Sequence, residues 1–466
     1  MALTPPARAT ARVRACAGLV LLAATAIAGC GDDPELVLQI RVPPDDQGLF
    51  HAVTQLNLTA SRDGVVLAQQ SFPATTSSVS LKGVSHGPRT IITLEGVDRS
   101  NQIIAHGRTC PLVFDGANTV APLYFAPTNF FAPTADTPAA RYESVAAALS
   151  DGTVLIVGGH DDQGAVLESA ELFVPGAATF ATVPGHTGPR TRAASTWLPD
   201  VGLLIVGGLD AAQPPQPIAE AELFLQTPRR FVPIADPRLE GRVGHQMVTL
   251  PDGRALMIGG RAGDTTLATT LYFAVLDDGT YKVTPGPALT EARRGHAATV
   301  AIGVPIVFGG YDVNGVPLDT IEALNVPYFM SQVIARLRTA RAEATASVLP
   351  DGSILLVGGI GPDGKPLADA ELFNPITRST DVYALAFPRH GHSATVLRDG
   401  RVLIAGGDID GTPSNEVELF VSGVGFLSER RLGVPRGEHL AVPLCDETVL
   451  VTGGGEGAEI YSGASR

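Results

Sequence analysis

The chain has 466 residues, and 52 glycines and 36 prolines among runs of β-branched residues exclude a helical repeat protein. Its formal net charge is −14, and the sequence has no basic patch. These features argue against nucleic acids and other anionic polymers as partners, because such polymers are bound by clustered lysine and arginine.

Residues 1–29 have the features of a bacterial secretion signal that ends in a lipidation site. Arg8, Arg12 and Arg14 give a positive start, and an apolar stretch too short to span a bilayer follows. The tail Ile27-Ala28-Gly29-Cys30 matches a bacterial lipobox. Cys30 is therefore predicted to become the acylated first residue of the mature protein, with several acyl chains, palmitate among them, holding it on a membrane.

The residues around the lipidation site also indicate a location. Cys30 is followed by Gly31 rather than by the Asp that often retains lipoproteins at the inner membrane. We therefore expect the outer membrane of a bacterial cell envelope, with residues 30–34 as a short tether. Only three lysines, Lys82, Lys282 and Lys365, accompany the arginines, which is typical of a GC-rich bacterial genome.

Residues 35–126 are predicted to form a small β-sandwich domain. Apolar and polar residues alternate in short runs such as Leu56-Asn57-Leu58-Thr59, as in strands with one buried face. The segment from Leu81 to Asp98 resembles carboxypeptidase-regulatory or transthyretin-like sandwiches. Because the tether is short, we expect this domain near the membrane, with the rest of the chain held outward.

Two cysteines, Cys110 and Cys445, remain once the signal and the lipidated residue are set aside. An exported protein can form a disulfide between them, and such a bridge would join the two domains. No cysteine spacing resembles a zinc or haem site. We expect two buried free thiols rather than a bridge, and the sequence leaves this pairing open.

From about residue 128 onward the chain repeats one phrase seven times, an apolar run that ends in Gly-Gly. Successive pairs are 49, 52, 50, 49, 48 and 47 residues apart. A fixed period near 50 residues indicates one supersecondary unit that is copied and stacked. The pairs are Gly158-Gly159, Gly207-Gly208, Gly259-Gly260, Gly309-Gly310, Gly358-Gly359, Gly406-Gly407 and Gly453-Gly454.

Each repeat predicts four antiparallel strands, as the fifth copy illustrates. Asp351-Gly352 is a two-residue hairpin signal, and the run from Ile354 to Val357 lacks alternation, as in a strand buried on both faces. A third strand ends in Glu371-Leu372-Phe373, and a fourth carries the aromatic Tyr383. Four such strands per repeat form a propeller blade.

These Gly-Gly-marked units resemble kelch repeats, the blades of kelch-type β-propellers. The resemblance covers about three quarters of the chain and implies an all-β protein with a seven-bladed propeller over residues 128–466. Kelch repeats usually carry Tyr in the third strand and Trp in the fourth, where this chain has mostly Phe and then Phe or Tyr. The single tryptophan, Trp197, lies in a different strand. These departures leave the predicted fold intact but weaken any transfer of function.

The last repeat, which runs from about residue 436 to 461, leaves no room for a fourth strand. Residues 128–136 resemble the fourth strand of the second repeat, at residues 227–236. We therefore expect a strand at about 129–133 to complete the last blade, which removes an exposed sheet edge.

One arginine precedes the first strand of every repeat, 16 or 17 residues before the Gly-Gly. Such a set could form a cationic ring that binds carboxylates or an anionic glycan. Six repeats also carry a third-strand glutamate, so we expect structural Arg–Glu pairs instead. The arginines are Arg141, Arg190, Arg242, Arg293, Arg341, Arg389 and Arg436, and the glutamates are Glu171, Glu222, Glu322, Glu371, Glu418 and Glu459.

No metal or cofactor site is predicted. Four repeats carry histidine at one equivalent position, but equivalent positions in different blades are held apart around the axis, so structural hydrogen bonds are expected. The acidic loops after the Gly-Gly pairs lack the glutamate of an EF-hand calcium loop and are typical of hairpin turns. A copper site like that of galactose-oxidase-like enzymes, which share kelch blades, would need tyrosines and histidines outside the repeat positions. The four histidines are His245, His296, His392 and His439.

The sequence therefore predicts a non-enzymatic, lipid-anchored envelope protein whose propeller loops bind another protein. Glycan binding by the same loops is the first alternative, and an enzyme resembling galactose oxidase is the second. Exposed apolar patches would favour a protein partner, and exposed aromatic residues on one rim would favour a glycan. A perturbed acid–base pair in the central funnel would favour an enzyme.

Overall fold

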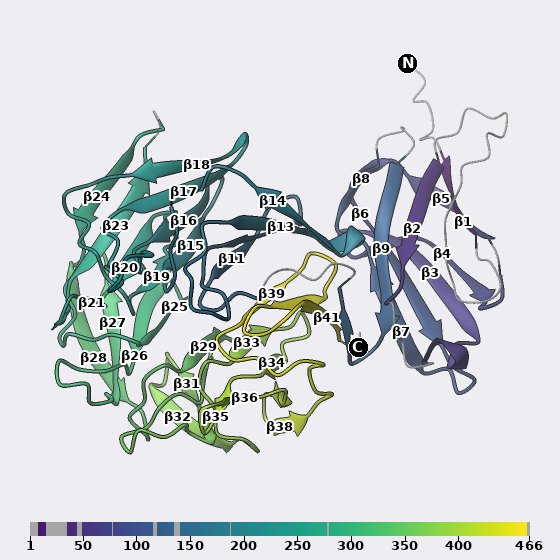
Figure 1. Ribbon diagram of the computed structural model, residues 1–466. Coiled ribbons are helices and arrows are strands. Elements are labelled where there is room, and N and C mark those ends of the chain that lie inside the picture. Colours follow the sequence, from purple (N-terminus) through teal and green to yellow (C-terminus); the bar gives the residue numbers. More distant parts are fainter. Residues whose placement is uncertain are drawn as a thin grey trace.

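The structure, a computed structural model, is built almost entirely from strands (Figure 1). It describes residues 8–14, 35–43, 49–76, 78–114, 119–134, 140–186, 188–276 and 279–463. Within these ranges the helices are two short 3₁₀ turns, η1 (Leu49–Ala52) and η2 (Pro175–Ala177). No described helix has the length and apolarity needed to span a bilayer. The predicted all-β class is confirmed.

The N-terminal domain is one continuous sheet. Its strands are β1 (Arg8–Arg14), β2 (Glu35–Arg41), β3 (Gln55–Arg62), β4 (Val65–Pro73), β5 (Ser78–Ser85), β6 (Gly87–Val97), β7 (Ile103–Arg108), β8 (Leu112–Phe114) and β9 (Thr119–Pro127). They follow the order β4-β3-β6-β7-β9-β2-β1-β5, and β8 pairs with β6. The two ends of the sheet, β4 and β5, contact each other, so the sheet folds over one apolar core that contains Leu38, Leu58 and Ile92.

Strand β1 lies in the segment predicted as the start of a secretion signal. It pairs in parallel with β2, with Thr10 opposite Glu35, and antiparallel with β5, with Arg14 opposite Ser78. The apolar stretch of the predicted signal and Cys30 lie outside the described residues. Cleavage before Cys30 would remove β1 and leave the facing edges of β2 and β5 unpaired. Residues 8–14 can therefore either leave with a cleaved signal or form β1 in the folded domain, but not both.

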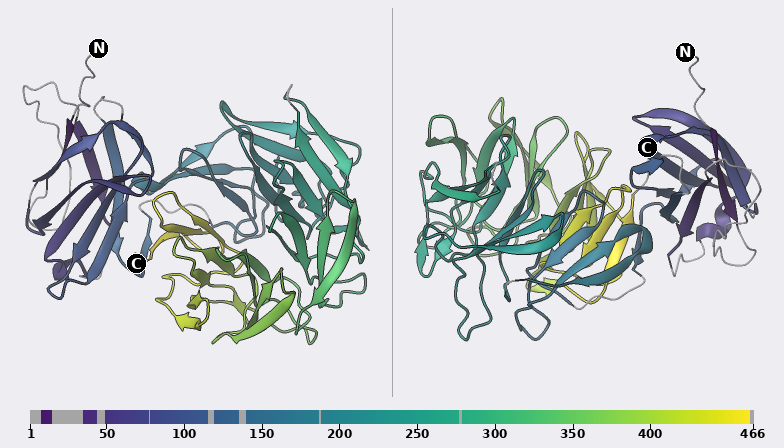
Figure 2. Two further views of the ribbon diagram at one scale, coloured as in Figure 1. Left: turned by 180° about the vertical axis from the view of Figure 1, so that it is seen from behind. Right: turned by 90° about the horizontal axis from the view of Figure 1, so that it is seen from above.

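The rest of the described chain forms seven four-stranded antiparallel sheets around a central axis (Figures 1 and 2), which confirms the predicted seven-bladed propeller. Blade 1 consists of β11 (Val145–Ala148), β12 (Val154–Val157), β13 (Ala170–Val174) and β14 (Thr179–Val183). Blade 2 consists of β15 (Ala194–Leu198), β16 (Gly202–Val206), β17 (Ala221–Gln226) and β18 (Arg229–Ile234). Blade 3 consists of β19 (Gln246–Thr249), β20 (Ala255–Ile258), β23 (Thr270–Val275) and β24 (Tyr281–Pro285).

Blades 4 to 6 repeat the same order of strands, and blade 7 takes one strand from before blade 1. Blade 4 consists of β25 (Ala297–Ala301), β26 (Val304–Phe308), β27 (Thr320–Asn325) and β28 (Met330–Arg336), and blade 5 of β29 (Thr345–Val348), β30 (Ile354–Val357), β31 (Asp369–Asn374) and β32 (Ser379–Ala384). Blade 6 consists of β33 (Ser393–Val396), β34 (Val402–Ala405), β37 (Val417–Val421) and β38 (Gly425–Ser428). Blade 7 consists of β39 (Leu440–Pro443), β40 (Val449–Thr452), β41 (Ala458–Ser462) and β10 (Phe130–Pro133). Small hairpins, β21 (Arg261–Ala262) with β22 (Thr265–Thr266) and β35 (Asp408–Ile409) with β36 (Thr412–Pro413), extend blades 3 and 6.

The first strand of each blade lines the axis, since β11, β15, β19, β25, β29, β33 and β39 contact one another in a ring. The second strand is the most buried, and every residue of β12, β20, β30 and β40 is buried. This burial on both faces explains the apolar runs without alternation. Neighbouring blades pack through these layers, as where the ring of Phe308 in blade 4 lies 5.8 Å from that of Phe373 in blade 5.

Blade 7 is completed by a strand that precedes the propeller in sequence. Strand β10 pairs antiparallel with β41, with Phe131 opposite Tyr461. The two aromatic rings lie 4.7 Å apart between centroids. This strand occupies the range in which a closing strand was expected. Because β9 leads directly into β10, the same pairing also joins the N-terminal domain to the ring.

A disulfide and a shared apolar core hold the two domains together. Cys110 follows β7, and Cys445 lies in the hairpin between β39 and β40, and the two form a disulfide. The expectation of two free thiols was wrong. The two cysteines approach each other only when the two domains dock, and the sequence contains no signal for how the domains dock. Tyr124 of β9 belongs to the core cluster that contains Ile156 of blade 1 and Ile460 of blade 7. The N-terminal domain thus lies against the outside of the ring, away from its axis (Figure 2).

Candidate functional site

The seven repeated arginines are buried structural residues, with exposed fractions between 0 and 4%. In every blade, Nη1 of the arginine donates to the carbonyl oxygen of the first glycine in the Gly-Gly pair, at 2.8–3.2 Å. In six blades the guanidinium also pairs with the third-strand glutamate, with N–O distances from 2.8 to 4.0 Å. These arginines are therefore not a cationic ring open to a ligand.

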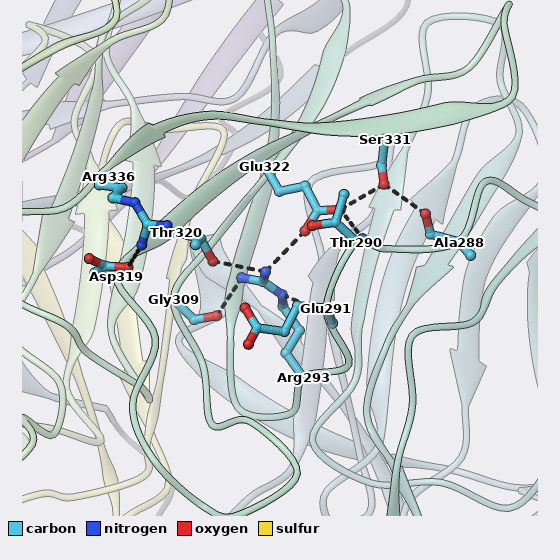
Figure 3. A network of polar contacts seen from close by, with 10 residues as sticks. All are labelled: Ala288, Thr290, Glu291, Arg293, Gly309, Asp319, Thr320, Glu322, Ser331 and Arg336. Atoms are coloured by element: carbon cyan, nitrogen blue, oxygen red, sulfur yellow. Dashed lines mark hydrogen bonds and ion pairs between the residues drawn. The ribbon is translucent and has the colours of Figure 1, made fainter.

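Blade 4 shows how such a pair is accommodated (Figure 3). Arg293 and Glu322 are both fully buried, and Arg293 Nη2 lies 3.0 Å from a carboxylate oxygen of Glu322. The guanidinium also donates to the carbonyl oxygen of Gly309 at 2.8 Å and to the hydroxyl of Thr320 at 3.0 Å. Glu322 in turn accepts from the amide of Thr290. These further hydrogen bonds offset the cost of removing both charges from water.

Blade 3 lacks this arrangement because Leu271 occupies the place of the glutamate, opposite Met257 of β20. Arg242 instead pairs with Glu240, at 3.5 Å between Nη2 and a carboxylate oxygen. Glu240 has a side chain that is 59% exposed, so this pair is far better solvated than the others. The six glutamates counted in the sequence are therefore the partners of six of the seven arginines.

The Gly-Gly pairs connect each blade to the next. In all seven, the amide of the second glycine donates to the main-chain carbonyl of the arginine in the following blade, at 2.7–3.0 Å. The glycines have φ between 55 and 98°. A Cβ atom on the first glycine would lie only 2.1–2.6 Å from the same carbonyl oxygen. The most visible motif of the sequence is therefore an inter-blade connection, and Gly454 of blade 7 completes it at Arg141 of blade 1.

The four equivalent histidines are buried, and two of them form the expected structural hydrogen bonds. His392 Nε2 lies 2.9 Å from the hydroxyl of Thr345 in the preceding blade, and His439 Nε2 lies 2.9 Å from that of Ser393. Neither His245 nor His296 has a hydroxyl partner of this kind among the described residues, and His245 interacts with the backbone of Val206 instead. The equivalent position in the preceding blade is Ala194 for His245 and Gln246 for His296, so neither supplies the hydroxyl that Thr345 and Ser393 provide. Burial lowers the pKa of His245 to about 3, so its ring is neutral at pH 7.

Ala194→Ser is expected to stabilise the protein by supplying the missing hydroxyl to His245. A new neutral hydrogen bond contributes about 1 kcal/mol to the free energy of unfolding, measured by denaturation in urea. Ala297→Ser is the matched control, because Ala297 has the equivalent place in β25 but faces Ala344, so its hydroxyl would be buried beside no histidine. Equal effects of the two substitutions would contradict this explanation.

A ring of residues that we call the mouth ring surrounds one end of the central channel. Each member lies two positions after a repeated arginine and has φ between 53 and 64°. Their backbones are linked from blade to blade, as where the amide of Arg192 donates to the carbonyl of Glu143 at 3.1 Å. The members are Glu143, Arg192, Gly244, Gly295, Glu343, Gly391 and Glu438.

Four members of the mouth ring are charged although their backbone conformation favours glycine. A non-glycine residue in the left-handed region costs about 1 kcal/mol relative to glycine, and three blades do use glycine here. Strained residues of this kind concentrate at functional sites. The charged members therefore mark the mouth of the channel as a candidate site. Their signal in the sequence is the residue two positions after each repeated arginine, which is charged in four repeats and glycine in three.

The mouth ring borders a cavity of about 690 Å³ to which all seven blades contribute. Its acidic residues, Glu343, Glu438 and Glu143, belong to blades 5, 7 and 1, while its basic residues belong to blades 2, 3 and 4. The basic residues are Arg192, Arg261 and Arg294. The cavity is thus lined by opposite charges on its two sides.

Glu143 and Glu438 lie in adjacent blades on the acidic side, but their surroundings differ. Arg192 Nε lies 2.6 Å from both carboxylate oxygens of Glu143, and His160 Nε2 lies 3.6 Å from one of them. Glu438 forms no ion pair with any described residue. Burial and then repulsion by Glu143 raise the pKa of Glu438 above its ordinary value, and the neighbouring Arg192 and His160 offset this shift only in part.

Two places have the ligand types of a cation site. Ligand atoms of Glu143, His160 and Glu438 lie within 4.8 Å of one another. Arg192, however, already binds both oxygens of Glu143, so a metal ion would have to displace it. In the acidic loops, Asp161 accepts hydrogen bonds from amides of its own loop at 2.8 and 2.9 Å, as a hairpin turn requires. Neither place therefore has a free set of ligands.

A second surface lies on the outside of the ring, far from the axis. The hairpin of β27 and β28 exposes Tyr328 by 75%, Phe329 by 57% and Met330, the first residue of β28, by 56%. Blades 3, 5 and 6 also expose apolar side chains on their third-to-fourth-strand hairpins, which form the outer side of the propeller (Figure 1). We call this surface the outer apolar edge; it consists of Leu276, Tyr281, Tyr328, Phe329, Met330, Val333, Ile376, Val382, Val424 and Leu427.

No family model matches the chain, and no curated protein matches it. The propeller is therefore established by the strands themselves. Of the predicted site residues, the arginines are buried within their blades and Cys30 lies outside the described residues. The structure brings forward two surfaces that sequence reasoning missed, the mouth ring and the outer apolar edge.

Proposed function

We propose that this protein is a kelch-type, lipid-anchored propeller of the bacterial envelope that binds another protein through the outer apolar edge. The observation that carries this proposal is the turn at residues 328–330, where three large apolar side chains are exposed together. Contiguous exposed apolar surface is uncommon on monomeric proteins and is typical of interaction sites. Aromatic residues and methionine are also the types enriched in protein interfaces.

Phe329 adds a conformational argument to its exposure. Its φ is 53°, in the left-handed region that a bulky residue rarely adopts. A turn selected for stability alone would carry glycine or asparagine at this position. Retaining phenylalanine there, exposed and strained, supports a role for its ring in binding a partner.

Glycan binding is favoured by one observation, the exposure of Tyr281, Tyr328 and Phe329 on the same edge. Aliphatic side chains such as Ile376, which is 75% exposed, lie on the corresponding hairpin of the next blade. A sugar needs hydrogen-bond partners beside its stacking platform, whereas a protein can cover aliphatic and aromatic groups together. The mixed surface therefore favours a protein partner. Action by binding rather than catalysis is supported by Arg192, which occupies both oxygens of Glu143, so that this carboxylate is not free to act as an acid or a base.

Export to the envelope is supported by the disulfide between Cys110 and Cys445, since disulfides persist in oxidising compartments outside the cytoplasm. Anchoring at Cys30 follows from the lipobox in the sequence. Cys30→Ser is expected to abolish acylation and to release the protein from the membrane fraction, measured by the intact mass of the protein and by fractionation. A Cys110→Ser variant is the matched control and should remain acylated. Equal membrane association of wild type and Cys30→Ser would contradict the anchor.

Phe329→Asn is expected to weaken partner binding while stabilising the fold. Asparagine tolerates the left-handed conformation, so the free energy of unfolding should rise by about 1 kcal/mol. Truncating an interface aromatic costs about 2 kcal/mol or more in binding. The measurement is capture of envelope proteins by wild type and variant, followed by affinity for the captured partner.

The matched control for Phe329→Asn is Val65→Ser with Val66→Ser in β4, which removes apolar surface of the N-terminal domain. The partner should still bind this control. A partner that binds Phe329→Asn as tightly as wild type, or that is lost with the control, would contradict the proposed surface. In that case a glycan array on wild type and Phe329→Asn would test the alternative.

A further inference from the structure

The cavity at the mouth ring is lined by charged side chains, and three of them, Glu438, Arg261 and Arg294, form no direct ion pair among the described residues. On the acidic side, Glu438 makes no direct ion pair with any described residue, although Arg192 and His160 are close enough to act on its pKa. On the basic side, Arg261 and Arg294 also form no ion pair within the described chain. The guanidinium of Arg294 instead lies over the ring of Tyr311, 4.9 Å from its centroid. Charged groups that line one cavity without a direct ion pair are available to a ligand, and the side chain of Arg261 is also exposed to solvent.

The order of the blades places these charges on opposite sides of the axis. Arg261 belongs to blade 3 and Arg294 to blade 4, while Glu438 belongs to blade 7. In a closed ring of seven blades, the place opposite blade 7 is the junction between blades 3 and 4. A ligand lying across the channel can therefore contact the carboxylate with one end and the two guanidinium groups with the other.

A buried histidine lines the same cavity. His245 is only 3% exposed and interacts with the backbone of Val206, and its ring has a second nitrogen without a partner of normal geometry among the described residues. Buried polar groups in folded proteins are almost always hydrogen-bonded, to protein, to water or to a ligand. His245 lies in blade 3, on the basic side of the cavity, where a neutral imidazole can donate to a carboxylate.

The charges also discriminate between classes of ligand. A simple cation would be attracted by Glu438 and repelled by the arginines. A simple anion would be attracted by the arginines and repelled by Glu438. A zwitterion satisfies both sides at once. We propose that the mouth ring binds a short peptide with free termini across the channel, its ammonium group at Glu438 and its carboxylate at Arg261 and Arg294. This site is separate from the outer apolar edge, so its success or failure leaves the proposed function untouched.

Trialanine is the probe, and isothermal titration calorimetry of the full chain in detergent is the measurement. Trialanine should bind, whereas N-acetyl-trialanine and trialanine amide, which each lose one terminal charge, should bind about tenfold more weakly or worse. Dialanine and tetraalanine test the length of the site. Absence of heat with all three free peptides up to about 10 mM, at which a weak site is still detected, would overturn the proposal.

Variants assign each terminus to its side of the cavity. Glu438→Gln should weaken trialanine about tenfold and leave N-acetyl-trialanine unchanged, because the lost partner was the ammonium group. Arg294→Gln should weaken trialanine but leave trialanine amide unchanged. Asp381→Asn and Arg230→Gln remove one charge each from outer strands β32 and β18 and should change nothing. If Glu438→Gln weakened the affinity for trialanine and for N-acetyl-trialanine equally, the carboxylate would not bind the ammonium group. That result would also overturn the proposal.

Discussion

Gly358→Ala is expected to destabilise the propeller by about 3 kcal/mol, with about 1 kcal/mol from the left-handed backbone and the rest from overpacking. Gly358 has a φ of 57°, and an added Cβ would lie 2.3 Å from the carbonyl oxygen of Arg389 in the next blade. That oxygen accepts the hydrogen bond from the amide of Gly359 at 2.9 Å. The methyl group can therefore be accommodated only if blades 5 and 6 move apart and this hydrogen bond lengthens.

The matched control is Gly364→Ala in the same blade. Gly364 has a φ of 74°, so the backbone cost is similar, but nothing lies within 4 Å of an added Cβ. This control should lose only about 1 kcal/mol. Urea denaturation followed by the fluorescence of Trp197, the only tryptophan, measures both. Equal losses for the two variants would mean that the Gly-Gly signature reports backbone conformation alone and not contact between blades.

The fold could be predicted because its determinants recur. The Gly-Gly pair marks a contact that every blade makes with the next, so its spacing counts the blades directly. The closing strand was visible because residues 128–136 resemble a fourth strand elsewhere in the same chain. The Cys110–Cys445 disulfide was not predicted, since it depends on how two different domains dock and no repeat reports that geometry.

The candidate sites were harder to predict for the opposite reason. Functional positions are those where the repeats differ, and a search for repeated residues passes over them. It drew attention to the arginines, which are buried and bonded within their blades. Glu438 and Glu143 stand where other repeats have Gly391 or Gly295, and only the closed ring shows that such positions face one cavity. Phe329 lies in a turn whose exposure and left-handed backbone become evident only in the structure.

Arg293→Met is expected to have the largest effect of all, a loss of about 3–5 kcal/mol in the free energy of unfolding, because it leaves a buried charge without its partner. Glu322 is fully buried, and Arg293 is its only cationic neighbour within ion-pair distance among the described residues (Figure 3). Arg336→Met is the control in the same blade, since the Arg336–Asp319 pair is exposed by 64% and 38% and should contribute about 1 kcal/mol or less.

The double variant Arg293→Met with Glu322→Leu separates the pair from its surroundings. If the damage in Arg293→Met comes from the abandoned carboxylate, replacing that carboxylate by leucine should restore stability, and the double variant should be more stable than Arg293→Met. Recovery should be incomplete, because the carbonyl of Gly309 and the hydroxyl of Thr320 still lose the donor that Arg293 supplied. A double variant as unstable as Arg293→Met would instead place the whole effect in those hydrogen bonds. The arginine would then act mainly as a cap on the Gly-Gly carbonyl, as Arg242 does in the one blade that has no such glutamate.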